Sequence, residues 1–307
     1  MYAFAVRRLV GAILTLFFLV SAVFVIMRLL PGDPATSIIG VNATQEDLAR
    51  VRSIWGLDKP LLTQYGAFLS QLVQGNLGLS FKTRRPALSM AARRFVNSLK
   101  LSGIAVALSI VVGIPIGVFA SVGSDSLAWI ARILMISSYV GSTIPVFWAG
   151  LLLMLLFAVK LRVLPTGGIG TWKHMVLPSL TLSIVSVGIL ARQTRASMAE
   201  ALRKDFVTTA RSKGLRETRV VTKHALRSAL IPVMTMAGMQ FGILLGGAVL
   251  TETVFSWPGL GYQLVDSILS RDYAVIQSGI LIFGGSFILI NLLVDILYCW
   301  ADPRIRL

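Results

Sequence analysis

Long apolar runs constrain the fold of this 307-residue chain more than any other feature. Each run carries charge only near its ends, and about 20 helical residues are enough to cross about 30 Å of hydrocarbon. The runs are continuously apolar rather than alternating, which favours membrane-crossing α-helices over the strands of a barrel. We therefore predict an all-α membrane protein with six spans, at 9–29, 101–123, 133–158, 174–194, 228–251 and 273–296.

Composition agrees with a chain that lies in lipid. The mean hydropathy is +0.79, and only 14% of residues are charged, against about a quarter in soluble domains. The first run follows Arg7 and Arg8 but is too long for the apolar core of a signal peptide, so we expect a retained first helix. We expect one membrane domain over residues 1–307.

The formal net charge of +16 could indicate nucleic-acid binding, but the basic residues flank the predicted spans. This is the distribution that the positive-inside rule requires, so we expect no nucleic acid as a partner. With six spans, both termini and the basic segment at 195–227 are expected in the cytoplasm. The segment at 30–100 is then extracytoplasmic. Its apolar stripe at 61–73 predicts an amphipathic helix that lies on the membrane, receives an outside partner or packs on the chain's own spans.

The sequence offers no recognisable catalytic or metal site. No glycine is followed by lysine, so there is no P-loop for ATP. His174 and His224 fall on opposite predicted sides of the membrane, and Cys299 has no partner at ligand spacing. Charge is absent from the middle of every span, which counts against a proton- or ion-driven carrier. We expect Glu252 and Asp295, near span ends, to be solvated by water or headgroups.

Small and polar residues mark one face of the fifth span. Gly238, Gly242 and Gly246 recur every four residues, a spacing that lets another helix approach closely. This face either packs within the chain, or it meets a second chain or lines a narrow path. Gln240 lies in the same span, where it either hydrogen-bonds to a neighbouring helix or contacts a substrate.

The segment from Arg192 to Arg227 carries ten Lys or Arg residues against three acids. A solvated cytoplasmic loop explains this charge, but it does not explain the apolar and small residues at the centre. Gly214 suits a left-handed helix end between two short helices. A short helix presented to a cytosolic partner explains both features.

At this point the residues resemble a family. The run at 205–215, Asp-Phe-Val-Thr-Thr-Ala-Arg-Ser-Lys-Gly-Leu, is similar to the cytoplasmic signature of ABC importer permeases. The resemblance is to the dipeptide, oligopeptide, nickel and glutathione group, and to the first of its two permease chains. Further matching motifs lie at 30–34, 56–60, 224–232, 251–261, 271–273 and 302–306.

The resemblance implies a type I importer in a bacterial inner membrane. Its partners would be a second homologous permease, two ATPase subunits that hold ATP and Mg, and an extracytoplasmic binding protein. This chain would bind no cofactor. A coupling helix would sit in an ATPase groove, where Ala210 permits close packing and Gly214 turns the chain. The residues carried over to this helix are Asp205, Phe206, Thr209, Ala210, Lys213, Gly214 and Leu215.

The resemblance also implies a substrate class. Short peptides are the expected cargo, with glutathione or a nickel chelate as the alternative. The short loop between the third and fourth spans is closer to the glutathione and nickel members. A secondary carrier or a channel with a basic loop is the competing class, and a membrane-bound enzyme lacks support because no catalytic constellation is present.

Overall fold

The computed structural model describes residues 2–29, 44–54, 58–122 and 128–301. The motif residues 30–34, 56–57 and 302–306 therefore lie outside the described part of the chain. Within that part all named elements are helices, and one isolated β-bridge joins Leu79 to Pro86. The all-α prediction is confirmed.

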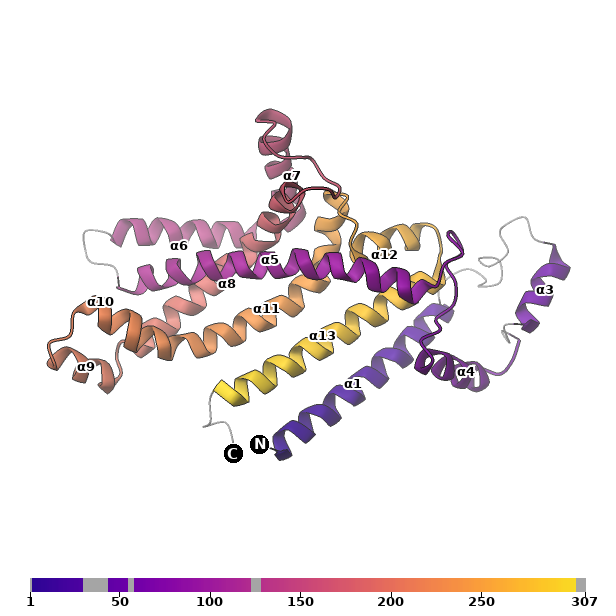
Figure 1. Ribbon diagram of the computed structural model, residues 1–307, viewed down its shortest axis with the longest axis horizontal. Helices are drawn as coiled ribbons and strands as arrows, with labels where there is room; N and C mark the ends of the chain where they lie inside the picture. The colour runs from indigo at the N-terminus through magenta and orange to yellow at the C-terminus, as the bar shows by residue number, and fades with distance from the viewer. Residues whose placement is uncertain (1, 30–43, 55–57, 123–127, 302–307) are drawn as a thin grey trace.

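Long helices run side by side through the molecule (Figure 1). Within the described residues, five helices are long and apolar enough to cross a membrane, and a bent pair can supply a sixth crossing. This agrees with the predicted multi-pass protein. The long helices are α1 (Tyr2–Leu29), α5 (Ala87–Val122), α8 (Lys173–Ala201), α11 (Leu226–Val254) and α13 (Tyr273–Ala301).

The predicted third span, 133–158, is not one helix. It comprises α6 (Ala128–Thr143), α7 (Val146–Leu153) and the π-helical η1 (Met154–Lys160), and the chain bends by 105° between α6 and α7. Pro145 stands at the break. Proline has no N–H to donate and disfavours a helical conformation at the residue before it, so an uncharged apolar run can still be interrupted.

The predicted outer segment, 30–100, also contains more helix than expected. It includes α3 (Gln45–Ile54) and α4 (Leu61–Val73), and its last residues, 87–100, form the beginning of α5. Helix α5 thus continues well beyond its apolar run at 101–122. The polar residues of this extension lower its hydropathy, so hydropathy alone does not detect it.

Helices α5 and α8 pack closely because glycine faces the neighbouring backbone. A Cβ atom on Gly113 would lie 2.9 Å from the carbonyl oxygen of Val187, and one on Gly117 would lie 2.5 Å from that of Ala191. Any side chain at these positions would force the helices apart. This contact explains why small residues recur along the buried face of α5. The helix itself continues through Pro115.

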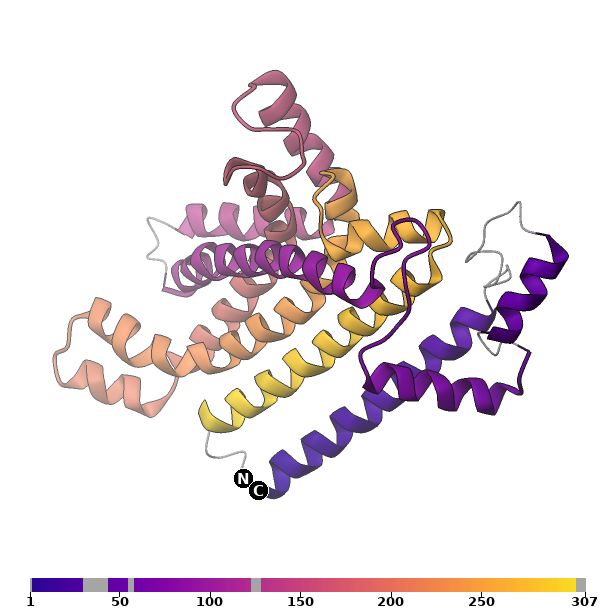
Figure 2. The ribbon, with the colours of Figure 1, turned by 45° about the vertical axis from the view of Figure 1, so that its right-hand side comes forward.

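Helix α4 packs on the chain's own long helices, which was one of the three alternatives left open by the sequence. Its Phe68 is buried in a cluster with Val20 and Phe24 of α1, and α13 contributes to the same cluster. Leu62 and Val73, near the two ends of α4, are 85% and 88% exposed. Figures 1 and 2 show α4 beside the second half of α1.

Candidate functional site

The basic segment folds into short helices around Gly214. Helix α9 (Asp205–Ser212) precedes the glycine, and α10 (Glu217–Arg219) and η2 (Val220–Ala225) lead into α11. Gly214 has φ +70°, and the N–H of Leu215 donates to the carbonyl of Ala210 at 3.4 Å. This is the usual termination of a helix by a left-handed glycine, as the sequence indicated.

An ion pair bridges the turn at Gly214. The Arg211 guanidinium donates two hydrogen bonds to the Glu217 carboxylate, at 3.1 Å from Nε and 2.6 Å from Nη2. The hydrogen bond and the negative charge of Glu217 raise the pKa of Arg211. Both side chains are exposed, so the pair adds little stability while it joins the end of α9 to α10.

One face of α9 is buried within the chain. Val207 is fully buried and Ala210 is 5% exposed, and residues three apart share a helix face. Ala210 therefore faces the chain's own bundle, and its packing in the groove of a partner stays a prediction. The cluster around these two residues contains Met198 and Ala201 of α8, Val220, Val221 and Ala225 of η2, and Ala229 of α11, with Val118 and Val122 of α5 packed against it.

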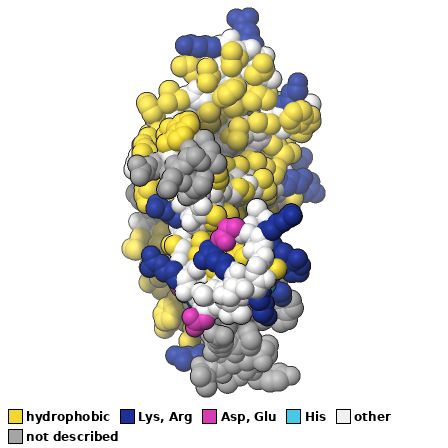
Figure 3. All heavy atoms as spheres, turned by 90° about the vertical axis from the view of Figure 1, so that its left-hand side faces the viewer, with side chains coloured by type: hydrophobic (Ala, Val, Ile, Leu, Met, Phe, Trp, Pro, Cys, Tyr) yellow, Lys and Arg dark blue, Asp and Glu magenta, His cyan; other side chains and the backbone are white. Residues whose placement is uncertain are grey.

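The other face of α9 is open. Asp205, Thr209 and Lys213 are exposed, and Phe206 is a 40% exposed aromatic residue beside them, whereas Leu215 is half-buried. The Thr209 hydroxyl donates to the carbonyl of Asp205 at 3.0 Å. Figure 3 looks onto this end of the molecule, where Lys and Arg side chains outnumber acidic ones. The predicted site residues thus divide into a buried anchor and an exposed contact face.

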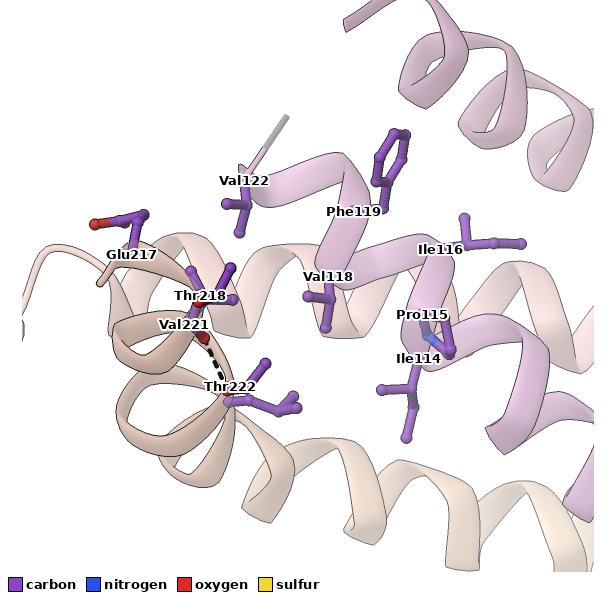
Figure 4. A pocket seen from close by; sticks show the side chains of 11 residues that line it. Ile114, Pro115, Ile116, Val118, Phe119, Val122, Glu217, Thr218, Val221 and Thr222 are labelled. Atoms are coloured by element: carbon purple, nitrogen blue, oxygen red, sulfur yellow. Dashed lines mark hydrogen bonds between the residues drawn. The ribbon is translucent and has the colours of Figure 1, made fainter. Parts of the chain in front are cut away.

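An apolar groove lies beside this segment, between α5 and the helices that precede α11 (Figure 4). Its volume is about 800 Å³. The Thr222 hydroxyl donates to the carbonyl of Thr218 at 2.8 Å, so this side chain offers little polarity to the groove. The lining residues are Ile114, Pro115, Ile116, Val118, Phe119, Val122, Glu217, Thr218, Val221, Thr222 and Leu226.

At the opposite end of the molecule, Glu252 is fully buried, so the expectation that it is solvated is wrong. Its carboxylate accepts a hydrogen bond from the Ser98 hydroxyl of α5 at 2.5 Å and one from the N–H of Tyr262 at 3.0 Å. The turn after α11 folds back over the carboxylate and removes it from solvent. Asp295 differs, since it is partly exposed and pairs with Arg8 of α1 at 2.8 Å.

Glycines make this turn possible. A Cβ atom on Gly259 would collide with the Glu252 carboxylate, and one on Gly261 would lie 2.6 Å from Cα of Val249. Helix α12 (Leu260–Leu269) begins between them. The sequence carried a signal for this arrangement, namely a lone acid in an apolar run followed by Trp257 and two glycines, but nothing in it pointed to Ser98.

The glycines at every fourth position of the fifth span do not all have the same surroundings. Cβ atoms on Gly238 and Gly242 would meet side chains of α13, at 2.5 and 3.2 Å, so these two glycines serve packing within the chain. Gly246 has nothing within 4 Å of such an atom and remains available to another chain. Gln240 is 5% exposed.

Among the described residues, no three His, Cys, Asp or Glu side chains form a group that could hold a metal ion. The imidazole Nδ1 of His174 lies 3.1 Å from the backbone N of Thr171, so this ring contacts its own loop.

Comparison with known families shows which family the chain belongs to. Residues 113–307 match the family described as binding-protein-dependent transport system inner membrane component, and residues 1–102 match the N-terminal region of such membrane components. The chain is an ABC importer permease. As a permease it is a non-catalytic membrane subunit of its transporter.

Relatives of this permease span its whole length. It is 46% identical over 306 residues to the glutathione transport system permease protein GsiC of Pectobacterium atrosepticum, covering 100% of this chain and 99% of that one. It is 45% identical, with the same coverage, to GsiC of Escherichia coli strain K12.

Solved structures share the fold of the permease. An inward-facing form of the MetNI methionine ABC transporter matches with a TM-score of 0.61 and 17% identity, over 71% of this chain and 98% of that chain. An amino acid ABC transporter solved with histidines matches with a TM-score of 0.53 and 16% identity, over 70% and 94%. At this identity the likeness concerns the fold, which is that of a type I importer permease.

Proposed function

We propose that this permease forms half of the translocation path of an ATP-driven glutathione importer in a bacterial inner membrane. The observation that carries the proposal is the identity of 45–46% to permeases named for glutathione transport, along the full length of the chain. Glutathione was the alternative to dipeptides and oligopeptides in the sequence analysis. It is itself a short peptide, and it replaces them here as the favoured cargo.

In this proposal α9 is the coupling helix and contacts an ATPase subunit in the cytoplasm. Its exposed face presents Phe206, Thr209 and Lys213, an aromatic side chain flanked by polar and basic groups. Aromatic residues such as Phe206 are enriched at protein contacts. The positive charge around α9 supports a cytoplasmic location, and with six crossings both termini would lie on that side.

The buried face of α9 supports the transmission of force. Val207 and Ala210 pack in one cluster with side chains of α5, α8, η2 and α11, and close-packed apolar clusters deform little. A displacement of α9 by the ATPase would therefore move the ends of these helices together. Alternation of the path between outward- and inward-facing states would follow from this rigid connection to the helices that bound it.

The other subunits of the transporter are inferred from the family to which the chain belongs. A second homologous permease would complete the path, two ATPase subunits would bind ATP and Mg, and a soluble binding protein would deliver the substrate from outside. Gly246, with open space at its Cβ position, is the part of the glycine face that remains free for contact with the second permease.

The test is uptake of radiolabelled glutathione by cells that lack their own glutathione importers and express the complete transporter. We expect ATP-dependent uptake that excess unlabelled glutathione suppresses and that dipeptides or nickel chelates do not. Uptake of a dipeptide with indifference to glutathione would refute the substrate assignment. Uptake that follows a proton gradient and ignores ATP would refute the importer itself.

The role of α9 is tested separately. Phe206→Ala should reduce co-purification of the ATPase subunits while leaving the permease inserted, because only an exposed contact is removed. Leu62→Ala is the control, since it also removes an exposed apolar side chain, at the far end of the molecule. Equal ATPase recovery with both variants would show that α9 is not the contact.

A further inference from the structure

The apolar groove between α5 and the basic segment has no part in the proposed function. On one side it follows α5 from Ile114 to Val122, and on the other it follows the chain from Glu217 to Leu226. Figure 4 shows Ile114 and Val118 pointing from α5 toward the helices of the basic segment. Eight of the eleven lining residues are apolar, so a ligand that fills the groove has to offer hydrocarbon rather than polar groups.

The groove has about the depth of one leaflet of a membrane. Residues 114–122 of α5 rise by about 12 Å, at about 1.5 Å per residue. They form the last part of an apolar run, and half of a hydrocarbon core of about 30 Å is about 15 Å. The groove therefore lies beside the acyl chains of the leaflet at this end of α5.

Positive charge borders the end of the groove at which α5 leaves its apolar run. Between residues 211 and 227, six Lys or Arg residues stand against one acid, Glu217. Arg211 pairs with Glu217 at 2.6 Å, and this pairing offsets the repulsion that the carboxylate would exert on an anion. Arg219 and Lys223 are exposed, and each follows a threonine of the lining in the chain. The polar end of the groove is therefore cationic.

The groove also adjoins the apolar cluster that holds α9. Val118, Val122, Val221 and Leu226 line the groove, and the same four side chains belong to this cluster or pack against it. A molecule in the groove would therefore contact the outside of the cluster. Because close packing limits how far a cluster deforms, such a molecule would stiffen the connection between α9 and α5.

An anionic lipid fits these features better than a second permease does. A homologous permease brings its own basic residues to this side of the membrane by the positive-inside rule, and like charges repel across an interface. The lipids of the cytoplasmic leaflet carry negative charge and are attracted to basic residues beside a span. Basic pockets between membrane helices on the cytoplasmic side bind anionic headgroups in the same way.

We propose that the groove binds an acyl chain of an anionic phospholipid, whose phosphate lies near Arg219 and Lys223. This inference rests on the proposed function for the cytoplasmic position of the basic segment and for the role of α9. The bound chain completes the packing around the α9 cluster, so a displacement of α9 by the ATPase reaches α5 with less loss. Glutathione uptake per ATP hydrolysed should therefore depend on anionic lipid.

The test of binding uses the complete transporter in nanodiscs of phosphatidylethanolamine with a phosphatidylglycerol probe that carries a photoreactive group in its acyl chain. After illumination, mass spectrometry should find the probe on peptides that contain residues 114–122 or 217–226. Each basic side chain near a membrane surface strengthens the binding of anionic lipid by about fivefold, so the double variant Arg219→Gln, Lys223→Gln should bind the probe about 25-fold more weakly.

A matched control removes the same charge elsewhere. Arg93 and Lys100 are exposed residues of α5 on the other side of its apolar run, and the double variant Arg93→Gln, Lys100→Gln should be labelled like the wild type. Equal labelling of the two double variants would overturn the proposal. Equal labelling of the wild type by a zwitterionic phosphatidylcholine probe would overturn it as well, because the basic residues would then select nothing.

Thr222→Trp tests the groove by volume. Thr222 is exposed and its hydroxyl donates to the carbonyl of Thr218, so the variant should fold, and its indole should occupy the groove and prevent labelling. Thr222→Val has nearly the shape of the wild type and should keep the labelling. In liposomes, replacement of phosphatidylglycerol by phosphatidylcholine should lower uptake per ATP in the wild type and have little effect on Thr222→Trp.

A protein in the groove is the outcome that contradicts the proposal most directly. A chemical crosslink from Thr222→Cys to the second permease, together with no labelling by lipid, would show that the groove is a subunit interface. Failure of the proposed function is recognised separately, because the wild-type transporter would then take up no glutathione in any lipid, whereas labelling of the groove requires no substrate.

Discussion

Replacement of Glu252 is the sharpest test of the packing at the α12 end of the permease. The fully buried carboxylate accepts hydrogen bonds from the Ser98 hydroxyl and the N–H of Tyr262. Glu252→Ala removes both acceptors and leaves a cavity. A buried donor without a partner costs about 1–3 kcal/mol, and the lost side chain adds a comparable term, so we expect a loss of about 3–6 kcal/mol in the free energy of unfolding.

Glu252→Gln separates the effect of the lost hydrogen bonds from the effect of the lost side-chain volume. The amide keeps the shape and one acceptor oxygen, but its NH₂ group then faces one of the two donors. We expect a loss of about 1–3 kcal/mol, clearly smaller than that of alanine. The measurement is the apparent melting temperature of the detergent-solubilised complex, with glutathione uptake in parallel.

Ser98 provides the second arm of this experiment. Its hydroxyl donates to Glu252 and accepts the N–H of Leu260 at 2.9 Å, so Ser98→Ala breaks both links. Because Ser98 and Glu252 are in contact, the double variant should lose less than the sum of the single losses, with a coupling of about 1 kcal/mol or more. Additive losses, or a Glu252→Ala variant that melts with the wild type, would refute the proposed network.

Three further predictions concern the helices. A Cβ atom on Gly214 would meet nothing within 4 Å, but its φ of +70° strains any larger residue by about 1–2 kcal/mol. The Gly214→Leu variant should therefore insert normally and lose glutathione uptake. Normal uptake would contradict the role of this turn. Gly117→Val should push α5 from α8 and cost about 1–3 kcal/mol, seen as a low yield of folded complex, whereas Gly103→Ala, in open space on the same helix, should give a normal yield. Asp295→Asn removes the partly exposed ion pair between α13 and Arg8, and the melting temperature should fall only slightly, by about 1 kcal/mol in stability.

Features that depend on local chemistry could be predicted from the sequence. Uninterrupted apolar runs identified the long helices, and the spacing of apolar residues identified α4. Gly214 was recognised as a left-handed helix end because the preference of glycine for that conformation needs no tertiary information. The family resemblance, confirmed by the matches over nearly the whole chain, came from ordered motifs of the same local kind.

Features that depend on contacts between distant residues could not be predicted. The burial of Glu252 requires Ser98 of α5, and 154 residues separate the two in sequence. The orientation of Ala210 is decided by the cluster from α5, α8 and η2 that covers it. Hydropathy also failed at the third span, because it sums side-chain preferences and overlooks the backbone effect of Pro145.

The bonds at the α12 end have a consequence for how the path can open. Glu252 links α11 to α5 and to the start of α12, and Asp272 links α13 to the hairpin at 79–86, before α5. Within the described residues at that end, four helices and a hairpin are thus joined as one block. Because these bonds join its parts, we expect the described part of this block to move as one body. For a substrate to enter there, the whole block would have to move away from its counterpart in the second permease. The opening would then form at the boundary between the two subunits.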